Sequence, residues 1–328
     1  MPAMSKSSRR GFLKALAGTT VAVSMATVTT GALAQAGTRA APAPGVLPGR
    51  TRLVPPSKIG IQLYTIRDKV SSLGFRAVFE ELSRIGYSEV EFAGYTQGTG
   101  AITPAQIRTL MDDFGLKALG SHIGRNDLLN NTNAQLDIAQ TLGMPYVGTA
   151  EAPTGSTTVA GYQAAGAAFN AAGTIAKSRG IKIYQHNHDS EFAFATDQPA
   201  VRRYDVFLQN TDPELVFLEM DVYWAYVGQY KYPGFQPIQY ILDNPRRYPL
   251  LHLKDGKSNP GSGNGYDIIE FGAGSIPYRD FLSQLPDRGS RVGVVEQDNA
   301  ASTAAGGAAI NSFGNAERSY DRMIGLRG

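Results

Sequence analysis

The sequence has 328 residues, with 31 lysines and arginines against 28 aspartates and glutamates, and it contains no cysteine. Without cysteine the chain cannot form disulfides or thiolate metal sites, so a bound metal must be held by His, Asp or Glu. Residues 1–36 carry four basic side chains and no acidic one. The rest of the chain is therefore close to neutral, and its charge does not predict a nucleic-acid partner.

The amino-terminal segment has the order of features that is typical of a twin-arginine signal peptide. Arg9 and Arg10 are followed by Gly-Phe-Leu-Lys and then by an uncharged stretch that ends at small residues near Ala34 and Ala36. Because glycine and threonine interrupt this stretch, it predicts a cleavable leader and no stable membrane insertion. We expect residues 1–36 to direct the chain to the twin-arginine export machinery, and the mature protein to be periplasmic or secreted.

Residues 37–57 are rich in Gly, Ala, Pro and Arg and have no apolar period, which predicts a flexible linker. From Lys58 onward, apolar runs alternate with helical patterns at intervals of roughly thirty residues. No change of composition marks a second domain, so we expect one catalytic domain over residues 58–328. The runs predict eight strands: Ile59–Tyr64, Ser88–Phe92, Lys117–His122, Tyr146–Thr149, Ile181–Asn187, Leu215–Asp221, Tyr248–Lys254 and Arg291–Glu296.

The helical segments between these strands begin and end at recognisable residues. Thr103 and Pro104 are typical of a helix start, and Gly86 and Gly115 are typical of helix ends. Strands separated by whole helices must be parallel, and eight of them favour a (β/α)8 TIM barrel over an open doubly wound sheet. The first strand leads into Gln62–Thr65 and not into a glycine-rich phosphate loop, which argues against a dinucleotide-binding domain.

All four histidines of the chain fall at the carboxyl end of a predicted strand, where TIM barrels carry their active sites. A single histidine at such a position is equally well explained as a hydrogen-bonded structural residue. Four histidines at one rim of the barrel indicate a shared site. Several carboxylates fall at the same level. The histidines are His122, His186, His188 and His252, and the carboxylates are Glu91, Glu151, Glu219, Asp221, Asp255 and Glu296.

A metal ion explains why so many charged side chains fall inside predicted strands. Charged residues buried in parallel strands are unfavourable unless they are paired or bind a cation. Residues two apart in a strand share a face, so that Glu219 and Asp221 point to one side. One cation held by side chains from four strands would satisfy these groups together. The predicted ligands are His186, Asp221, His252 and Glu296.

At these residues the chain resembles the xylose isomerase-like TIM barrels known as sugar phosphate isomerases/epimerases. The resemblance extends from about Ile59 to Gln297 and depends on the order and spacing of short motifs. It implies one divalent metal ion (Mn, Mg, Co or Zn), with ligands from strands six, seven and eight at Asp221, His252 and Glu296. The motifs are Gly60–Tyr64, His186–Asp189, Met220–Trp224, Leu251–Asp255, Gly272–Gly274 with Ile276–Pro277, and Val295–Asp298.

Strand five departs from the family pattern. Epimerases of the family use two glutamates, from strands five and eight, as acid and base. This chain has His186 in place of the strand-five glutamate and keeps only Glu296. Either His188 or Glu191 supplies the second acid/base, or the reaction needs a single base, as an elimination does. Glu191 is also an alternative to His186 as a metal ligand, because the loop after strand five can fold back.

The expected chemistry is proton abstraction next to a carbonyl that a metal ion polarises. Glu296 or His188 is the expected base. Lys254 is expected to neutralise negative charge on a substrate oxygen or to bind a hydroxyl, with a salt bridge to Asp255 or Glu219 as the alternative. The glycine-rich segment Gly256–Ser275 is either a lid over the substrate or a surface insertion. The residues expected to contact the substrate are His122, Tyr64, Glu151, Trp224, Asn187 and Glu191.

These features support a metal-dependent isomerase or epimerase that acts on a sugar or keto-sugar. The alternative is a lyase or dehydratase that acts on a keto-sugar or keto-glycoside at the same metal site, which the missing strand-five glutamate favours. A third hypothesis, a non-catalytic periplasmic sugar-binding barrel, would not require the complete ligand set. Four histidines are too few for the multi-metal site of the related endonuclease barrels. The expected partner is a carbohydrate, and the sequence is compatible with a homo-oligomer.

Overall fold

Short apolar strands alternate with helices along the chain, as the sequence predicts. The computed structural model describes residues 51–95 and 101–328. Eight parallel strands form the central sheet, and all of them lie at the predicted positions. They are β1 (Ile59–Gln62), β2 (Glu89–Phe92), β3 (Lys117–Ser121), β4 (Tyr146–Thr149), β5 (Lys182–His186), β6 (Val216–Asp221), β7 (Leu250–Leu253) and β10 (Val292–Val295).

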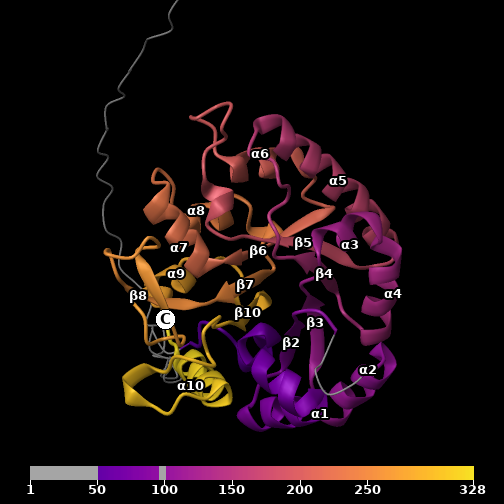
Figure 1. The fold of residues 1–328 in the computed structure, drawn as a ribbon, viewed down its shortest axis with the longest axis vertical. Coiled ribbons are helices and arrows are strands. Elements are labelled where there is room, and N and C mark those ends of the chain that lie inside the picture. Colours follow the sequence, from indigo (N-terminus) through magenta and orange to yellow (C-terminus); the bar gives the residue numbers. More distant parts are fainter. Residues whose placement is uncertain (1–50, 96–100) are drawn as a thin grey trace, which may run out of the picture. The chain divides into compact units, whose positions relative to one another are not determined.

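The strand order β3-β2-β1-β10-β7-β6-β5-β4 closes the sheet almost completely into a barrel (Figure 1). The edge strands β3 and β4 meet through a bridge between His122 and Gly148, where the Ile123 amide donates to the Gly148 carbonyl at 2.9 Å. A side chain at position 148 would lie 2.5 Å from the Tyr184 ring, so the seam requires glycine there. The predicted (β/α)8 barrel is confirmed.

Helices surround the barrel and begin and end at the residues that predicted them (Figure 1). Thr103 forms a capping box with Gln106 at the start of α2, and Gly86 ends α1 with φ 112°. Glycine adopts this left-handed backbone more readily than any other residue. The helices are α1 (Arg67–Ile85), α2 (Pro104–Asp113), α3 (Arg125–Asn130), α4 (Thr132–Leu142), α5 (Val159–Ser178), α6 (Arg203–Asn210), α7 (Val222–Lys231), α8 (Pro237–Asp243), α9 (Tyr278–Ser283) and α10 (Ser312–Gly325).

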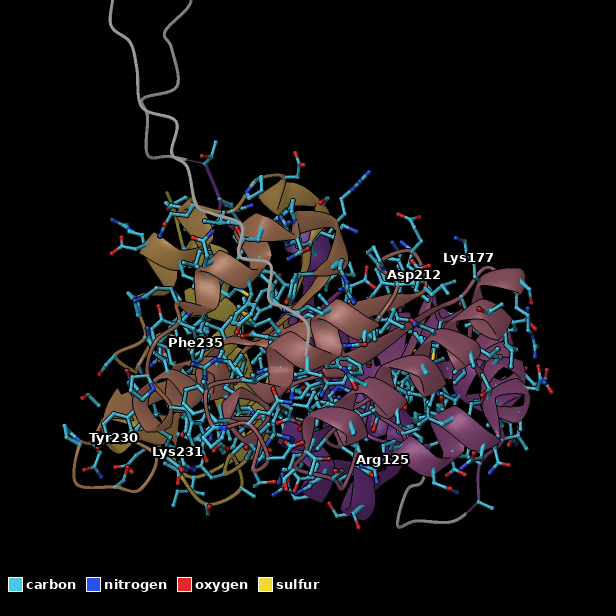
Figure 2. The ribbon with its side chains drawn as sticks, turned by 90° about the horizontal axis from the view of Figure 1, so that it is seen from above. Arg125, Lys177, Asp212, Tyr230, Lys231 and Phe235 are labelled. Carbon is cyan, nitrogen blue, oxygen red and sulfur yellow. The ribbon has the colours of Figure 1, made fainter. Side chains whose placement is uncertain are left out.

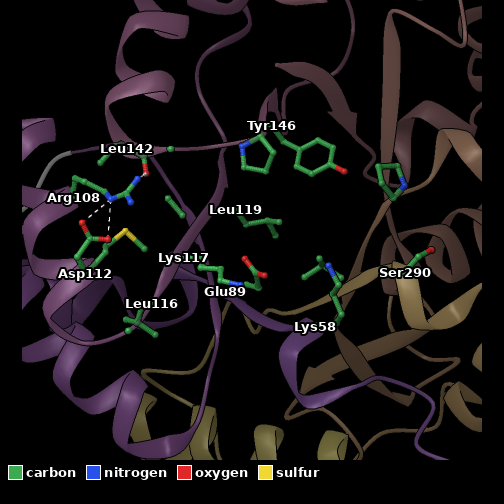
Figure 3. Close-up of a pocket in the computed structure, with 17 residues that line it drawn as sticks. Lys58, Glu89, Arg108, Asp112, Leu116, Lys117, Leu119, Leu142, Tyr146 and Ser290 are labelled. Atoms are coloured by element: carbon green, nitrogen blue, oxygen red, sulfur yellow. Dashed lines mark hydrogen bonds and ion pairs between the residues drawn. The ribbon is translucent and has the colours of Figure 1, made fainter. Parts of the chain in front are cut away.

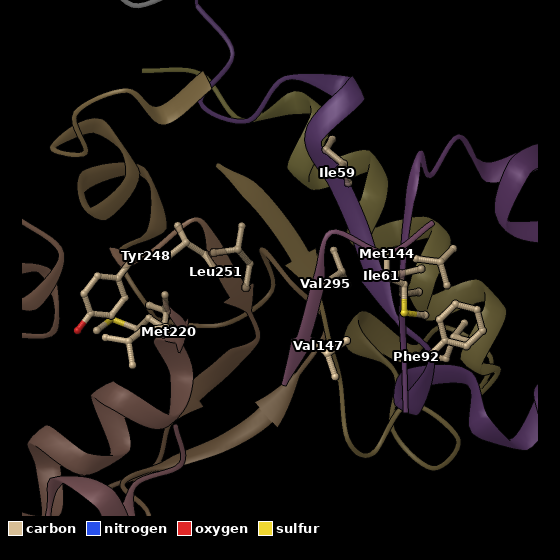
Figure 4. Packing of buried hydrophobic residues seen from close by; sticks show 14 of the residues in the cluster. Ile59, Ile61, Phe92, Met144, Val147, Met220, Tyr248, Leu251 and Val295 are labelled. Carbon is tan, nitrogen blue, oxygen red and sulfur yellow. The ribbon is translucent and has the colours of Figure 1, made fainter. Parts of the chain in front are cut away.

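Apolar side chains fill two layers. The larger cluster joins the strands to the surrounding helices and includes Ile61, Phe92, Val147 and Met220 (Figure 4). The smaller cluster lies inside the barrel and consists of Leu119, Tyr184, Leu250, Val292 and Val294.

The barrel interior changes from apolar to polar along the strands. Two positions beyond Tyr184, Leu250 and Val294, on the same strand face, the chain carries His186, His252 and Glu296. The carboxyl ends of β5, β7 and β10 therefore hold polar side chains above an apolar floor.

Residues 51–57, which the sequence placed in the linker, belong to the folded unit. Leu53 and Val54 are buried, and the Leu53 amide donates to the Leu326 carbonyl at 3.2 Å. Leu53 packs beside the carboxyl terminus and Val54 beside Gly293 of β10. The local composition does not reveal these distant partners, which explains the difference. Residues 1–50, with the predicted leader, lie outside the described residues. Among the described residues, no helix is long and apolar enough to cross a membrane.

The segment after β7 forms an antiparallel hairpin of β8 (Asp255–Ser258) and β9 (Tyr266–Ile269). This hairpin occupies most of the predicted glycine-rich segment. Its tip contacts α7, where Tyr230 Oη donates to the Pro260 carbonyl at 3.0 Å (Figure 2). The neighbouring Lys231 forms a 2.7 Å ion pair with Asp189 from the loop after β5. The hairpin, α7 and this loop are thus linked to one another.

Candidate metal centre

The four histidines converge at the carboxyl ends of the strands. The ring centroids of His186 and His252 are 4.5 Å apart, and those of His122 and His186 are 4.8 Å apart. The His188 ring lies 5.2 Å from that of His186. Pairing of Asp221 with His252 between β6 and β7 brings a carboxylate to the same level.

The four predicted metal ligands form one group, here called the outer set. His186, Asp221, His252 and Glu296 are buried, and each offers one ligand atom within 4.8 Å of the others. His252 Nδ1 lies 3.0 Å from Glu296 Oε2, and His186 Nε2 lies 3.7 Å from Asp221 Oδ2. Asp221 Oδ2 accepts no hydrogen bond although it is buried. This oxygen therefore suits a cation ligand.

A second group, here called the inner set, shares two of these histidines. His122, His186, Glu219 and His252 also place one ligand atom each within 4.8 Å of the others. Glu219 Oε2 lies 2.8 Å from His122 Nε2 and 3.2 Å from both His186 Nδ1 and His252 Nε2. Glu219 precedes Asp221 by two residues on β6, so the inner set lies one layer deeper in the barrel. His186 and His252 therefore present one ring nitrogen to each set.

Lys254 places a positive charge beside the outer set. Its ammonium lies 2.9 Å from Glu296 Oε2, 3.0 Å from Asp298 Oδ1 and 3.3 Å from Asp221 Oδ2. Burial favours the neutral amine, but the three carboxylates outweigh it and raise the pKa of Lys254 well above its usual value. Tyr278 Oη donates to the Lys254 carbonyl and holds this end of the strand.

The pKa shifts reflect burial of many charges in a small volume. Burial raises the pKa of Asp221 to about 6, against the effect of Lys254. Burial also opposes ionisation of Glu296, but Lys254 and His252 hold its pKa well below the usual range. For His252, the surrounding carboxylates outweigh burial and raise the pKa well above its usual value.

Carboxylates outnumber the fixed cations around this site. Lys254 is the one lysine or arginine in contact with them among the described residues, so a divalent cation would offset a surplus of negative charge. The donor set of imidazole nitrogens and carboxylate oxygens fits such an ion. The carboxylates that contact Lys254 or a ring of the histidines are Glu91, Glu219, Asp221, Glu296 and Asp298.

A cavity of about 370 Å³ opens onto the outer set. Tyr64 is 43% exposed at its edge, with the Arg67 guanidinium stacked 3.9 Å from the ring centroid. Burial, followed by the charge of Lys254, lowers the pKa of His188 to about 4. The polar residues that line the cavity are Tyr64, His122, His188, Lys254, Glu296 and Asp298, together with the ligand His186.

Four residues expected to contact the substrate do not line this cavity. Asn187 is buried and donates to the Asp221 carbonyl at 3.1 Å, which supports the strand backbone. Glu191 is buried and accepts from the His188 amide and from Ser190 Oγ. The Trp224 ring packs edge-on against the ring of His188, with centroids 5.4 Å apart. Glu151 is exposed and follows Ala150, which does line the cavity.

The sequence placed Glu91 at the level of the histidines and Asp298 in a family motif, but it predicted no role at the site for either residue. Asp298 follows Glu296 by two positions, and its carboxylate contacts Lys254. Glu91 Oε2 lies 2.6 Å from His252 Nε2, and its other oxygen accepts from Tyr184 Oη. Side chains alternate between the two faces of a strand, so Glu296 and Asp298 fall on the same side. This alternation is the sequence signal that could have identified Asp298.

A larger cavity, of about 720 Å³, lies at the opposite ends of the strands (Figure 3). Glu89, Lys58 and Lys117 line it together with apolar residues, and Arg108 pairs with Asp112 at its side. Burial raises the pKa of Glu89, against the effect of Lys117 and Lys58. Active sites of TIM barrels lie at the carboxyl ends of the strands, and none of the chain's histidines lines this cavity. The smaller cavity is therefore the candidate site.

Comparison with known proteins agrees with this architecture. A family model described as xylose isomerase-like TIM barrel matches residues 79–312. No curated protein matches the chain.

Solved structures with the same fold include proteins with related descriptions. Two proteins from Parabacteroides distasonis, described as sugar phosphate isomerase/epimerase, superpose with TM-scores of 0.65 and 0.64, at 24% and 25% identity. They cover 82% and 81% of this chain, and 94% and 97% of their own. The IOLI protein, solved with a bound zinc atom, has a TM-score of 0.61 at 15% identity, over 81% of this chain and 98% of its own. At the 15% identity of IOLI, the likeness shows the fold alone.

Proposed function

The chain belongs to the xylose isomerase-like TIM barrel family, and we propose that it is a divalent-metal-dependent isomerase or epimerase of an unphosphorylated sugar or keto-sugar. The observation that carries the proposal is the outer set, in which side chains from four strands bring two imidazoles and two carboxylates within 4.8 Å of one another. The descriptions of the Parabacteroides structures and the zinc atom of IOLI support it.

The proposed ligands of the cation are His186, Asp221, His252 and Glu296. A mixed set of nitrogen and oxygen donors suits Mn, Co or Zn, and Mg is less well matched because it prefers oxygen ligands. When bound, such a cation acts as a Lewis acid that polarises a carbonyl and acidifies the neighbouring C–H group.

The remaining cavity residues supply the proton transfer and the charge balance. His188 lines the cavity as a neutral imidazole, which leaves a ring nitrogen able to accept a proton from substrate carbon. Glu296, which also lines the cavity, is the second group able to hold a proton there. The Lys254 ammonium is oriented by three carboxylates and can stabilise negative charge on a substrate oxygen. Tyr64 presents an exposed ring on which a sugar can stack.

Charge in the cavity favours an unphosphorylated substrate. Among the described residues, Lys254 is the one lysine or arginine that lines the cavity, and its ammonium already contacts Asp221, Glu296 and Asp298. A phosphate group would meet these carboxylates, and Arg67 at the edge of the cavity already donates to the carbonyls of Tyr64 and Asp298. Neutral sugars or keto-sugars avoid this repulsion.

A lyase or dehydratase acting on a keto-sugar or keto-glycoside is the second candidate function. It is favoured by the placement of Glu191, which is buried outside the cavity and so provides no second carboxylate opposite Glu296. One base beside the site suffices for an elimination. We further propose that the protein acts outside the cytoplasm after twin-arginine export, based on Arg9, Arg10 and the uncharged stretch that follows them.

The test combines metal analysis with solvent exchange. Purified protein is expected to bind one equivalent of Mn²⁺, Co²⁺ or Zn²⁺ and to catalyse deuterium incorporation from heavy water into a member of a panel of keto-sugars. Asp221→Asn should weaken metal binding more than about 100-fold and abolish the exchange, because it removes a ligand. Asp267→Asn, at an exposed position of β9 that belongs neither to the outer set nor to the cavity lining, is the control and should retain both. Failure of the wild-type protein to bind any divalent metal would refute the proposal, whereas turnover without exchange would favour a reaction other than enolisation.

A further inference from the structure

The histidines of the outer set have a second ring nitrogen that faces deeper into the barrel. A neutral imidazole has one N–H group and one lone pair, so each ring can bind a metal through one nitrogen only. The inner set competes for the lone pairs of His186 and His252, because it contacts His186 Nδ1 and His252 Nε2. Hydrogen bonds around these rings decide which nitrogen carries the proton.

The proton of His122 is fixed by Gln62. The Gln62 carbonyl oxygen accepts from the Tyr64 amide at 3.2 Å, which leaves the Gln62 amide nitrogen 3.3 Å from His122 Nδ1. An amide N–H can only donate, so Nδ1 carries the lone pair and Nε2 carries the proton. His122 Nε2 then donates to Glu219 Oε2 at 2.8 Å. This nitrogen is therefore not a metal ligand.

Glu91 fixes the proton of His252 in the same way. It accepts from Gln62 Nε2 at 2.8 Å and from Tyr184 Oη, so both of its oxygens act as acceptors. His252 Nε2, at 2.6 Å from Glu91 Oε2, must then be the donor. Metal binding requires the neutral ring, and in the neutral ring the lone pair of His252 is on Nδ1, which lies 3.0 Å from Glu296 Oε2 in the outer set.

Glu219 has the corresponding role for His186. Its Oε2 lies 3.2 Å from His186 Nδ1, and it already accepts from His122. With the proton on Nδ1, the His186 lone pair is on Nε2, which faces Asp221. Both Glu91 and Glu219 are fully buried, so water does not compete for these contacts.

We infer that Glu91 and Glu219 are positioning residues, which hold His252 and His186 in the tautomers that direct His252 Nδ1 and His186 Nε2 to the cation. It follows that the inner set holds protons and not a second cation. The inference rests on the proposed function for the presence of a cation in the outer set. A carboxylate that accepts from the far nitrogen of a ligand histidine fixes the ring and raises its basicity.

Nitrogen NMR on the wild-type protein tests the inference directly, because the chain has only four histidines. Protein labelled with ¹⁵N-histidine is titrated with Zn²⁺, which is diamagnetic. We expect the metal-bound shift at His252 Nδ1 and His186 Nε2, while His122 keeps its proton on Nε2. A metal-bound shift at His252 Nε2 or His122 Nε2 would overturn the inference and assign the metal to the inner set, with metal binding itself intact. Absence of any Zn²⁺ binding would overturn the proposed function and this inference together.

Variants provide a second, quantitative readout. Glu91→Gln and Glu219→Gln should each weaken Zn²⁺ binding by about 10- to 100-fold and increase the population of the other tautomer of His252 or His186, since an amide can donate to the ring nitrogen. Glu89→Gln lies two residues before Glu91 on the same strand, contacts no histidine and is the matched control, expected to bind Zn²⁺ with unchanged affinity. Loss of binding in Glu219→Gln as complete as in Asp221→Asn would identify Glu219 as a ligand and contradict the inference. If a variant does not fold, the nitrogen spectrum of the Zn²⁺-bound wild-type protein still tests which ring nitrogens bind the metal.

Discussion

At the scale of the residue, burial decides what each carboxylate does. Glu191 stands in the loop after β5, where sequence reasoning considered it as a metal ligand or a second acid/base. In the structure it is fully buried, accepts two hydrogen bonds on Oε2 and has no partner for Oε1. Burial raises the pKa of Glu191 to about 7, so the folded protein keeps this proton to a higher pH than the unfolded chain.

The raised pKa of Glu191 predicts a pH-dependent stability. Between about pH 4.5 and 7 the unfolded chain has lost this proton and the folded protein has not, so its contribution to stability falls as the pH rises. By pH 8 the buried charge destabilises the fold by about 3 kcal/mol. In Glu191→Gln this loss should be absent, and the melting temperature of the variant relative to wild type should increase from pH 4.5 to pH 8.

Thermal unfolding followed by circular dichroism over this pH range provides the measurement. Glu80→Gln, at an exposed position on α1, is the control for replacing a glutamate by glutamine. Parallel pH profiles for wild type and Glu191→Gln would show that this carboxyl does not titrate as the structure indicates.

At the scale of the element, one side chain organises the long excursion between β7 and α9. Asp255 begins β8 and accepts from the backbone amides of Gly256 at 2.8 Å, Gly272 at 2.9 Å and Gly274 at 3.1 Å. A side chain at position 274 would lie 2.0 Å from Asp255 Oδ1, so glycine permits this close approach. The carboxylate thus connects the two ends of the hairpin segment beside Lys254.

Asp255→Asn should loosen this segment. An amide has one acceptor oxygen, so at least one buried N–H group would face an N–H group, and each unsatisfied donor destabilises by about 1–3 kcal/mol. We expect a loss of about 2–4 kcal/mol of unfolding free energy in urea titrations. Backbone amides of residues 256–276 should exchange with deuterium faster, while those of α1 and α5 should not.

The matched control for this element is Asp267→Asn. Asp267 lies in β9 of the same hairpin and accepts only an exposed hydrogen bond from Asn259, at 2.7 Å. Its replacement should change stability by less than about 0.5 kcal/mol. Equal destabilisation by the two variants would mean that the amide contacts of Asp255 are not what holds the segment.

At the scale of the whole molecule, charge and composition separate the amino-terminal segment from the barrel. The four basic residues before Ala36 account for the calculated positive charge of the chain, and the remainder is nearly neutral. This asymmetry supports the proposal that residues 1–36 are an export signal.

Replacing both Arg9 and Arg10 by lysine should prevent export, because the twin-arginine machinery reads the arginine pair. Cell fractionation with immunoblotting should then find the uncleaved chain in the cytoplasm, and mass spectrometry of the exported wild type should find an amino terminus near residue 37. Lys6→Arg, which keeps the charge and the arginine pair, is the control. Unchanged export of the double variant would exclude this route.

The sequence by itself determined the barrel and three members of the outer set, and it left the fourth open between His186 and Glu191. Strands buried on both faces appear as local apolar runs, and glycines with left-handed backbone mark helix ends such as Gly86, so both signals are local. Asp221, His252 and Glu296 could be named because barrel topology brings the carboxyl ends of all strands together.

Only the tertiary structure decided how these groups are paired. His252 and Glu91 are 161 residues apart in the chain, and no local pattern indicates that their side chains touch. The same is true of Lys254, whose carboxylate partners come from β6 and from the end of β10, and of Leu53, which is buried beside Leu326. Hydrogen-bond direction, tautomer and burial depend on contacts between distant strands, and those contacts exist only once the barrel has closed.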